Sequence, residues 1–250
     1  MRWPLALAAG ILAVAASLLA GCGQERVAKP PPRADPQGTG SAWQPLSQRS
    51  GGLRGRPLAA RLVRRVRLRE RPGGRVVRAL GMRTGFGSPR MLAVVARRGR
   101  WLAVLSEHLP NSRAGWIPAA GAQLLVVPYE LQVDVSARLL VVQRHGRTVR
   151  RVSVAVGRPG TTTPTGRFAV TDALRVERGS PYGCCVLALT GRQPNVPRGW
   201  PGGDRLAIHG TPNEATIGTA ASSGCLRAAE REMRWLMSRV PLGTPVRIRA

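Results

Sequence analysis

The chain has 250 residues and a formal net charge of +27 at pH 7, and its positive charge is almost wholly arginine, since Lys29 is the only lysine. This balance is typical of proteins that bind anionic polymers. Nucleic acid is excluded as a partner, because the amino terminus indicates export and no basic helix with interleaved aromatic residues is present. Anionic lipid headgroups and cell-wall polymers are the candidate partners of the basic surface, and a solvated surface without a partner is the alternative.

A signal for export and lipid attachment stands at the amino terminus. Arg2 precedes an apolar run over residues 5–19, which is shorter than the roughly 20 residues of a membrane-spanning helix. The run ends in Leu19-Ala20-Gly21-Cys22, which resembles a bacterial lipobox and implies a lipid on the Cys22 thiol. We expect residues 1–21 to be a lipoprotein signal peptide, with a plain secretory signal or a membrane helix as the alternatives. The mature chain is then exported and anchored to the outer face of the cytoplasmic membrane.

Two segments of different composition follow. Residues 22–57 are rich in Pro, Gly, Ser, Gln and charge, so we expect a flexible linker. Residues 58–127 contain short apolar runs between turn residues and predict strands over 62–70, 75–80, 90–99, 100–108 and 114–125. This spacing indicates a small all-β barrel. The stretch GRWLAVL…AGWIPA resembles the bacterial SH3-like domain, which implies that Trp101 and Trp116 are core residues and that the domain is a spacer or a wall-binding module.

Residues 128–250 predict a second, mostly β domain. A hairpin series covers 129–157, with His145 at a solvated turn; His108, earlier in the chain, is also expected in a loop. Further strands are predicted over 161–170, after an initial turn, and over 183–191 and 205–210. A helix and a closing strand over 244–250 follow, the helix having its apolar face on Ala229, Met233, Leu236, Met237 and Val240. This order excludes a doubly wound nucleotide-binding fold.

The stretch LAIHGTPNEATIGTAASSGCLR (206–227) brings one of three histidines, His209, close in sequence to one of four cysteines, Cys225. A thiol becomes a nucleophile when a base takes its proton, and imidazole is the usual base. The small residues before Cys225 let backbone amides converge as oxyanion donors, and the start of the following helix favours a thiolate. Nucleophile, base and oxyanion donors are the parts of an acyl-transfer site.

The residues alone leave two alternatives. Cys225 would be a small buried residue and His209 a strand end. Otherwise His209 and Cys225 would bind zinc together with Cys184 and Cys185, although adjacent cysteines lack the usual spacing for closing on one ion. We expect Cys184 and Cys185 to be strand residues of a packed sheet, and Cys225 to stay free.

The segments IHGT…GTAASSGCLR, TPTGRF and PLGTPVRI together resemble the catalytic domain of the L,D-transpeptidase (YkuD) family. The family's motif is His-Gly, a variable stretch, then Ser-His-Gly-Cys-(Ile/Val)-Arg. The resemblance implies a β-sandwich-type domain with one helix after the catalytic cysteine, here preceded by the small SH3-like β-barrel, so that the chain is mostly β. It assigns the base to His209 and the nucleophile to Cys225, the carbonyl that orients the base to Gly210, and the oxyanion donors to the amides of Gly224 and Cys225.

The same motif places Arg227 where it binds a stem-peptide carboxylate or braces the loop. This chain departs from the family at Ser223, which stands where histidine is usual. We expect Ser223 to shape the loop and contact the substrate, so the departure concerns rate and substrate preference.

The resemblance also implies the reaction. Cys225 attacks the carbonyl of the third, diamino-acid residue of a peptidoglycan tetrapeptide stem, D-Ala leaves, and the side-chain amine of a second stem resolves the thioester into a 3→3 cross-link. No metal or organic cofactor is implied, and the partners are donor and acceptor stem peptides. Water as acceptor gives a carboxypeptidase instead. A non-catalytic wall-binding lipoprotein is the alternative from another class, and Ser223 is the feature that favours it.

Overall fold

A computed structural model describes residues 44–45, 56–177, 179–196 and 203–250. The predicted signal peptide, Cys22 and most of the predicted linker lie outside these residues. The described chain is mostly β-structure with one α-helix, as the sequence predicts. Within the described ranges, no helix is both long and apolar enough to cross a bilayer.

Residues 56–126, which we call the N-terminal unit, belong to an eight-stranded sheet in which every neighbouring pair is antiparallel. Its strand order is β1-β8-β2-β5-β6-β7-β3-β4, with β1 contributed by the two described residues upstream. The strands are β1 (Gln44–Pro45), β2 (Leu58–Leu62), β3 (Val66–Arg69), β4 (Val76–Leu80), β5 (Met91–Arg98), β6 (Trp101–Leu105), β7 (Ala114–Pro118) and β8 (Ala122–Val126). The SH3-like identity of this unit stays a prediction.

Inward leucines form the core of the N-terminal unit, and the arginines between them face water. In β3, Val66 and Leu68 are buried while Arg67 is exposed, as the alternation of side chains along a strand requires. The fully buried positions of this core include Leu68, Leu80, Leu92, Leu102 and Ile117.

The structure corrects three details of the N-terminal prediction. The single strand expected over 62–70 is wrong, because β2 ends at Leu62 and three exposed residues precede β3. The strand expected over 114–125 is split into β7 and β8 by a 3₁₀ turn at Ala119–Gly121, where Gly121 packs so closely on the Val66 side chain that a Cβ would collide. Trp101 and Trp116 are half-buried, so their assignment to the core is also wrong.

Residues 128–250, the C-terminal unit, contain a second eight-stranded sheet with the order β11-β10-β9-β18-β13-β14-β15-β17. The pairs β9–β18 and β15–β17 are parallel and the other pairs antiparallel, and β12 and β16 form a small parallel pair. The elements are β9 (Tyr129–Asp134), β10 (Leu139–Arg144), β11 (Arg147–Ser153), β12 (Val156–Gly157), β13 (Gly166–Arg175), β14 (Cys185–Arg192), β15 (Arg205–His209), a 3₁₀ turn (Glu214–Thr216), β16 (Ala220–Ser222), β17 (Leu226–Arg227), α1 (Glu230–Arg239) and β18 (Pro245–Arg249).

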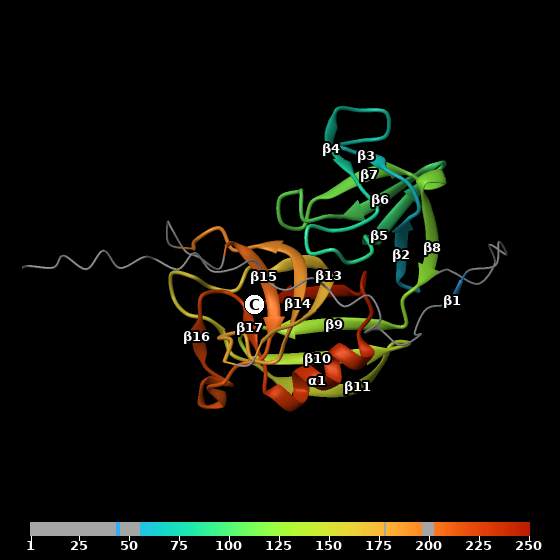
Figure 1. Cartoon of the computed structure of the whole chain (residues 1–250). Coiled ribbons are helices and arrows are strands. Elements are labelled where there is room, and N and C mark those ends of the chain that lie inside the picture. The colour runs from blue at the N-terminus through green and yellow to red at the C-terminus, as the bar shows by residue number, and fades with distance from the viewer. Residues whose placement is uncertain (1–43, 46–55, 178, 197–202) are drawn as a thin grey trace, which may run out of the picture.

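The helix α1 packs on this sheet at the end far from the N-terminal unit (Figure 1). Met233 and Leu236 of the predicted apolar face are fully buried, and Val240 directly after the helix is 1% exposed. The predicted turn at His145 is confirmed: His145 and Gly146 both have positive φ and are exposed. His108 lies in a loop as predicted, but its Nε2 lies 3.5 Å from the Glu107 carboxylate.

Apolar side chains join the two units. Ala59 and Met91 of the N-terminal unit belong to the same buried cluster as the C-terminal core. A smaller cluster joins Ala93 and Leu105 to Ala169 of β13. The N-terminal unit is therefore packed on the C-terminal sheet.

Candidate functional site

The parallel pairing of β15 with β17 places Cys225 beside the strand that ends at His209. In this register Ile208 faces Leu226 and His209 faces Arg227, so Cys225 lies next to Ala207. The Cys225 Sγ donates to the carbonyl oxygen of Arg205 at 3.7 Å and accepts a bond from the backbone N–H of Ala207. Cys225 thus lies alongside the strand that ends at His209, two positions before the residue that pairs with His209.

His209 is 4% exposed and its ring is fixed from two sides. Its Nδ1 lies 2.6 Å from the carbonyl oxygen of Gly210, and Tyr182 meets the ring edge to face at 5.1 Å between centroids. A carbonyl only accepts, so Nδ1 carries the hydrogen and Nε2 is left with a free lone pair. Burial lowers the pKa of His209 to about 4. The charge of Arg227 lowers this pKa further, whereas the hydrogen bond to Gly210 raises it. The imidazole is therefore neutral at pH 7 and able to take a proton.

The Cys225 thiol is also neutral at rest. Its dense protein surroundings raise its pKa, although the Ala207 N–H and the charge of Arg227 act in the opposite direction. Cys225 nevertheless keeps part of its surface exposed and is the free cysteine of the described chain. A thiol that is neutral at rest has to lose its proton when the sulfur attacks, and a neutral imidazole is able to accept that proton.

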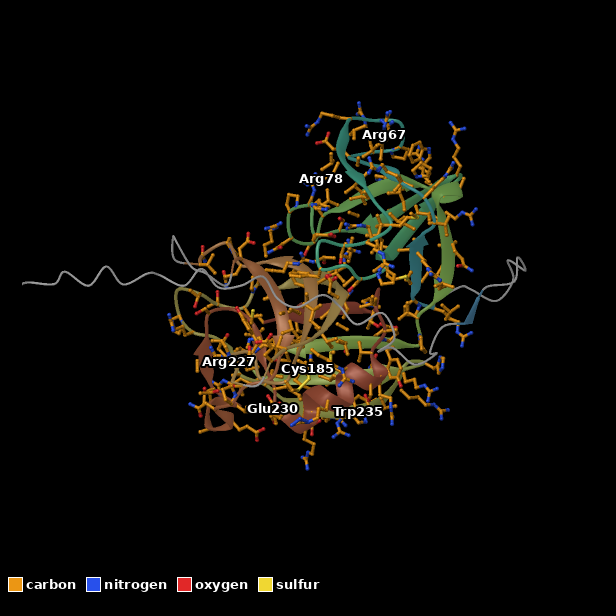
Figure 2. All side chains as sticks on the ribbon, in the orientation of Figure 1. Arg67, Arg78, Cys185, Arg227, Glu230 and Trp235 are labelled. Atoms are coloured by element: carbon orange, nitrogen blue, oxygen red, sulfur yellow. A yellow bond between two sulfur atoms is a disulfide. The ribbon has the colours of Figure 1, made fainter. Side chains whose placement is uncertain are left out.

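Gly210 is held by a segment that the sequence did not associate with the site. Its N–H donates to the carbonyl of Cys185 at 3.1 Å. The carboxylate of Glu230 lies where a Gly210 side chain would be, and it accepts the N–H of Cys184 at 3.0 Å. Figure 2 shows Cys185, Glu230 and Arg227 in the same part of the C-terminal unit. Glu230 thus fixes the backbone whose carbonyl orients His209.

Ser222 closes the loop that carries Cys225. Its Oγ donates to the carbonyl of Cys225 at 2.6 Å and accepts the N–H of Gly224 at 3.0 Å. The Gly224 amide, expected as an oxyanion donor, is therefore engaged within the loop in this state. Among the described residues, no group accepts a hydrogen bond from the Cys225 amide.

Buried side chains on neighbouring segments hold the same loop from outside. Thr163 Oγ1 donates to the carbonyl of Gly224 at 2.9 Å. The Gln193 amide packs so closely under Gly224, at φ 116°, that a Cβ there would collide with it, and its Nε2 donates to the carbonyls of Thr161 and Thr162 at 3.1 and 2.9 Å. The TPTGRF motif was the signal for Thr163, but nothing in the sequence pointed to Gln193.

The two remaining predicted site residues lie on either side of Cys225. Ser223 is half-buried, and within the described chain its hydroxyl makes no protein hydrogen bond, so the loop-shaping role expected of it belongs to Ser222. Arg227 pairs with Ala155 through its backbone, and its buried Nε has no hydrogen-bond partner in the part of the chain that the structure describes. Its charge lowers the pKa of both His209 and Cys225.

Cys184 and Cys185 form a disulfide with each other, across a Cα separation of 3.8 Å. The prediction that both are strand residues is half right, since Cys185 begins β14 and Cys184 precedes it. The four-residue zinc site considered for these cysteines is not available, because both sulfurs are already bonded. Cys225 remains free, as expected.

Comparison with known proteins shows which family the chain is similar to. The model of the family "YkuD: L,D-transpeptidase catalytic domain" matches residues 128–248. Among curated proteins, YkuD of Bacillus subtilis (strain 168) is 32% identical over 154 residues, which are 58% of this chain and 85% of that protein. ErfK/SrfK of Salmonella typhimurium (strain LT2) is 29% identical over 180 residues, 61% of this chain and 57% of that protein. Both names assign L,D-transpeptidase activity provisionally.

Among solved structures, an L,D-transpeptidase from Mycobacterium smegmatis covers 57% of this chain and 76% of its own, with 18% identity and a TM-score of 0.40. The family model and the B. subtilis relative carry the assignment. The chain belongs to the YkuD family of L,D-transpeptidases.

Proposed function

We propose that the protein is a cysteine-dependent L,D-transpeptidase that forms 3→3 cross-links between peptidoglycan stem peptides. The observation that carries the proposal is a free, partly exposed thiol alongside the strand that ends in a histidine whose Nδ1 is fixed by the Gly210 carbonyl. That arrangement leaves the Nε2 lone pair of a neutral imidazole for the thiol proton. It matches the requirements of nucleophilic catalysis at a peptide carbonyl.

The reaction has two halves. In the first, the Cys225 sulfur attacks the carbonyl of the third residue of a tetrapeptide stem while His209 Nε2 takes the thiol proton. The tetrahedral intermediate collapses, D-Ala leaves with the proton from His209, and a thioester remains. In the second, the side-chain amine of another stem attacks the thioester and gives its proton to His209. The collapse releases the thiolate, which takes that proton back, and a 3→3 amide bond has formed.

Negative charge develops on the carbonyl oxygen in both halves. The Cys225 amide supports it, because this N–H is directed to no other described protein group. The Gly224 amide adds a second donor only when its bond to Ser222 opens. Arg227, whose buried Nε has no hydrogen-bond partner among the described residues, is the group suited to a stem-peptide carboxylate.

The test is incubation of the purified protein with a disaccharide tetrapeptide and mass analysis of the products. A transpeptidase gives D-Ala and a dimer that fragments at a 3→3 bond. A carboxypeptidase gives D-Ala and monomeric tripeptide. A non-catalytic wall-binding protein gives neither product, which would contradict the proposal.

Acid should reduce the acylation rate only at unusually low pH. Since the pKa of His209 is lowered to about 4 and the neutral ring is the base, kcat/KM for D-Ala release should stay flat from about pH 8 to pH 5. Below about pH 4 it should fall tenfold per pH unit. An inflection near the ordinary histidine value of about 6.5 would show that His209 is solvated in the working enzyme.

Alanine substitutions at Ser222 and Ser223 compare two adjacent serines of the loop that carries Cys225. Ser223→Ala should lower kcat by about tenfold or less, in line with about 0.5–1.5 kcal/mol for one hydrogen bond to substrate. Ser222→Ala removes two loop bonds and should cost more than Ser223→Ala. Steady-state D-Ala release measures both. An inactive but folded Ser223→Ala variant would place that serine in the catalytic machinery.

We also propose that a lipid on Cys22 anchors the protein to a membrane. A lipid on this thiol would hold the enzyme at the outer face of the cytoplasmic membrane, and the segment 22–57 would let it reach the wall. Cys22→Ala should release the protein from membranes or block its maturation, because each buried CH₂ of the lipid contributes about 0.8 kcal/mol. Membrane fractionation and the mass of the mature amino terminus measure this, and no change in either would contradict the lipobox prediction.

The basic surface of the N-terminal unit favours an anionic wall polymer as a further partner. Arg67 and Arg78 lie at its far end from the C-terminal unit (Figure 2). Over residues 56–126 the exposed acid is Glu70, which pairs with Arg75. The exposed arginines there are Arg56, Arg61, Arg64, Arg65, Arg67, Arg71, Arg75, Arg78, Arg83, Arg97, Arg98, Arg100 and Arg113. Such a surface attracts a polyanion in a salt-dependent way.

A further inference from the structure

Arg205 connects the nucleophile with the contact between the two units. Its carbonyl oxygen accepts the Cys225 thiol at 3.7 Å. Its guanidinium donates to the carbonyl of Leu189 and, at 2.8 Å, to Thr171 Oγ1, and 21% of the side chain is exposed. Arg205 begins β15 and His209 ends it. Contacts that fix the Arg205 guanidinium therefore also fix the start of β15, where the Arg205 carbonyl accepts the Cys225 thiol.

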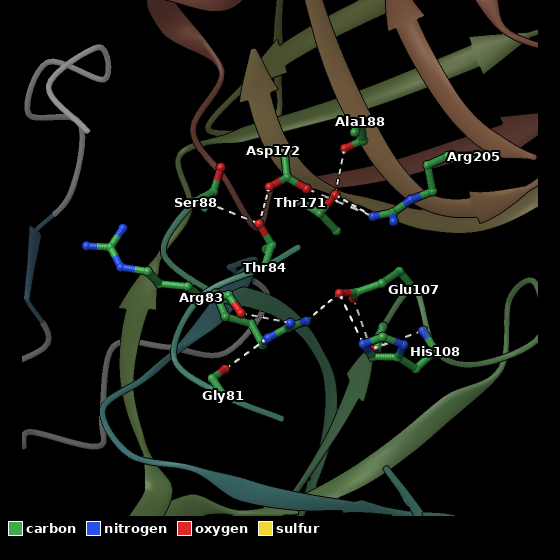
Figure 3. A network of polar contacts seen from close by, with 12 residues as sticks. Gly81, Arg83, Thr84, Ser88, Glu107, His108, Thr171, Asp172, Ala188 and Arg205 are labelled. Atoms are coloured by element: carbon green, nitrogen blue, oxygen red, sulfur yellow. Dashed lines mark hydrogen bonds and ion pairs between the residues drawn. The ribbon is translucent and has the colours of Figure 1, made fainter. Parts of the chain in front are cut away.

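Charges from both units surround this guanidinium. Asp172 of β13 is fully buried, and its Oδ2 lies 4.0 Å from Arg205 without a hydrogen bond inside the described ranges. Its Oδ1 accepts the hydroxyl of Thr84, which comes from the N-terminal unit (Figure 3). Burial lowers the pKa of Arg205, while the carboxylates of Glu107 and Asp172 act against that effect. A buried carboxylate needs such partners, so the N-terminal unit helps to hold Asp172 in place.

A second tie from the N-terminal unit reaches the same point of the sheet. Arg192 pairs with Arg205 across β14 and β15. The side-chain amide of Asn111 accepts the N–H of Arg192 at 2.8 Å and donates to its carbonyl at 2.7 Å. The Arg192 guanidinium in turn holds the Asp204 carboxylate at 2.6 and 2.9 Å, one residue before Arg205. Both strands are thus fixed from the N-terminal unit at the start of β15.

We propose that the N-terminal unit is a structural part of the active site, and that Arg205 is the positioning residue through which its docking sets the place of the Cys225 thiol. The proposal deepens the proposed function and rests on it for the chemistry. While the two units are docked, the Arg205 carbonyl holds the thiol proton until His209 takes it. Without the contacts of Thr84 and Asn111, the start of β15 loses its support and the thiol loses a fixed acceptor.

The experiment weakens the contact from the N-terminal side only. In the full mature chain, the double variant Thr84→Val and Asn111→Ala removes the hydroxyl bond to Asp172 and both bonds to Arg192. We expect kcat for D-Ala release to fall about tenfold or more at an unchanged KM, since small displacements of reacting groups cost up to about a hundredfold. The pH midpoint of Cys225 alkylation by iodoacetamide should move to lower pH, because the bond to a carbonyl favours the protonated thiol.

Glu70→Gln is the matched control, since Glu70 is an exposed acid of the same unit whose partner is Arg75. It should leave kcat and the alkylation profile unchanged. Arg205→Lys is the second variant, for the case that the double variant does not fold. It keeps the charge but not the paired guanidinium bonds, and should shift both readouts in the same direction.

A folded double variant with wild-type kcat and a wild-type alkylation profile would overturn the proposal. So would a lower kcat with an unchanged alkylation profile, since the damage would then not act through the thiol. If the wild-type protein released no D-Ala, the proposed function would fail, but the alkylation profile would still decide whether docking positions Cys225.

Discussion

Cys225→Ala should abolish D-Ala release and cross-linking. The thioester route needs the sulfur itself, and neither a backbone amide nor His209 can replace it as the nucleophile. The alanine side chain fits without collision, because it is the cysteine without its sulfur, so the sheet around β17 should keep its fold. Product analysis by mass measures the activity and circular dichroism the fold. Full activity in a folded Cys225→Ala variant would show that the paired His209 and Cys225 are only neighbours.

His209→Ala should lower kcat by about 10²–10⁴-fold, the usual value of a general base. The thiol of Cys225 has a raised pKa, so without the imidazole little thiolate forms at neutral pH. Raising the pH should therefore restore part of the rate in the variant, whereas the wild-type rate should not rise between about pH 6 and pH 8. Steady-state D-Ala release from about pH 6 to pH 10 separates the two cases. A variant with less than a tenfold loss at pH 7 would remove His209 from the role of base.

The central residues of the site could be predicted from the sequence because they lie in one short motif. Mostly small residues separate the adjacent His209 and Gly210 from Cys225, and the pairing of β15 with β17 then brings the two segments side by side. The helix could also be predicted, because apolar residues recur at the helical period and Pro241 follows them. The period gives the buried face of α1, and the proline gives its end. Patterns that are local in sequence give structure that is local in space.

The supports of the site could not be predicted, because they are distant in sequence. Gln193 and Glu230 act through a close approach to a glycine, at Gly224 and Gly210, and no sequence pattern marks such a contact. The role expected for Ser223 went to Ser222, one position earlier, because the direction of a side chain in a tight loop depends on its φ and ψ. Arg205 reads as an ordinary strand residue until the N-terminal unit is docked against it.

The Cys184–Cys185 disulfide was missed for a similar reason. The sequence shows two adjacent cysteines, but whether they pair depends on the local backbone, which here follows Gly183 at φ 66°. The pairing leaves Cys225 as the free thiol of the described chain.

Acylation of Cys225 by a carbapenem would show whether this thiol is the nucleophile. The strained lactam carbonyl offers the thiol the same attack as the stem peptide, and the product keeps the whole drug mass on the protein. Intact mass spectrometry of the purified chain, followed by peptide mapping, locates the adduct. We expect one adduct per chain, on the peptide that contains Cys225, and none in Cys225→Ala. An adduct on any other residue, or an unmodified wild-type protein that is folded and has a free Cys225 thiol, would contradict this expectation.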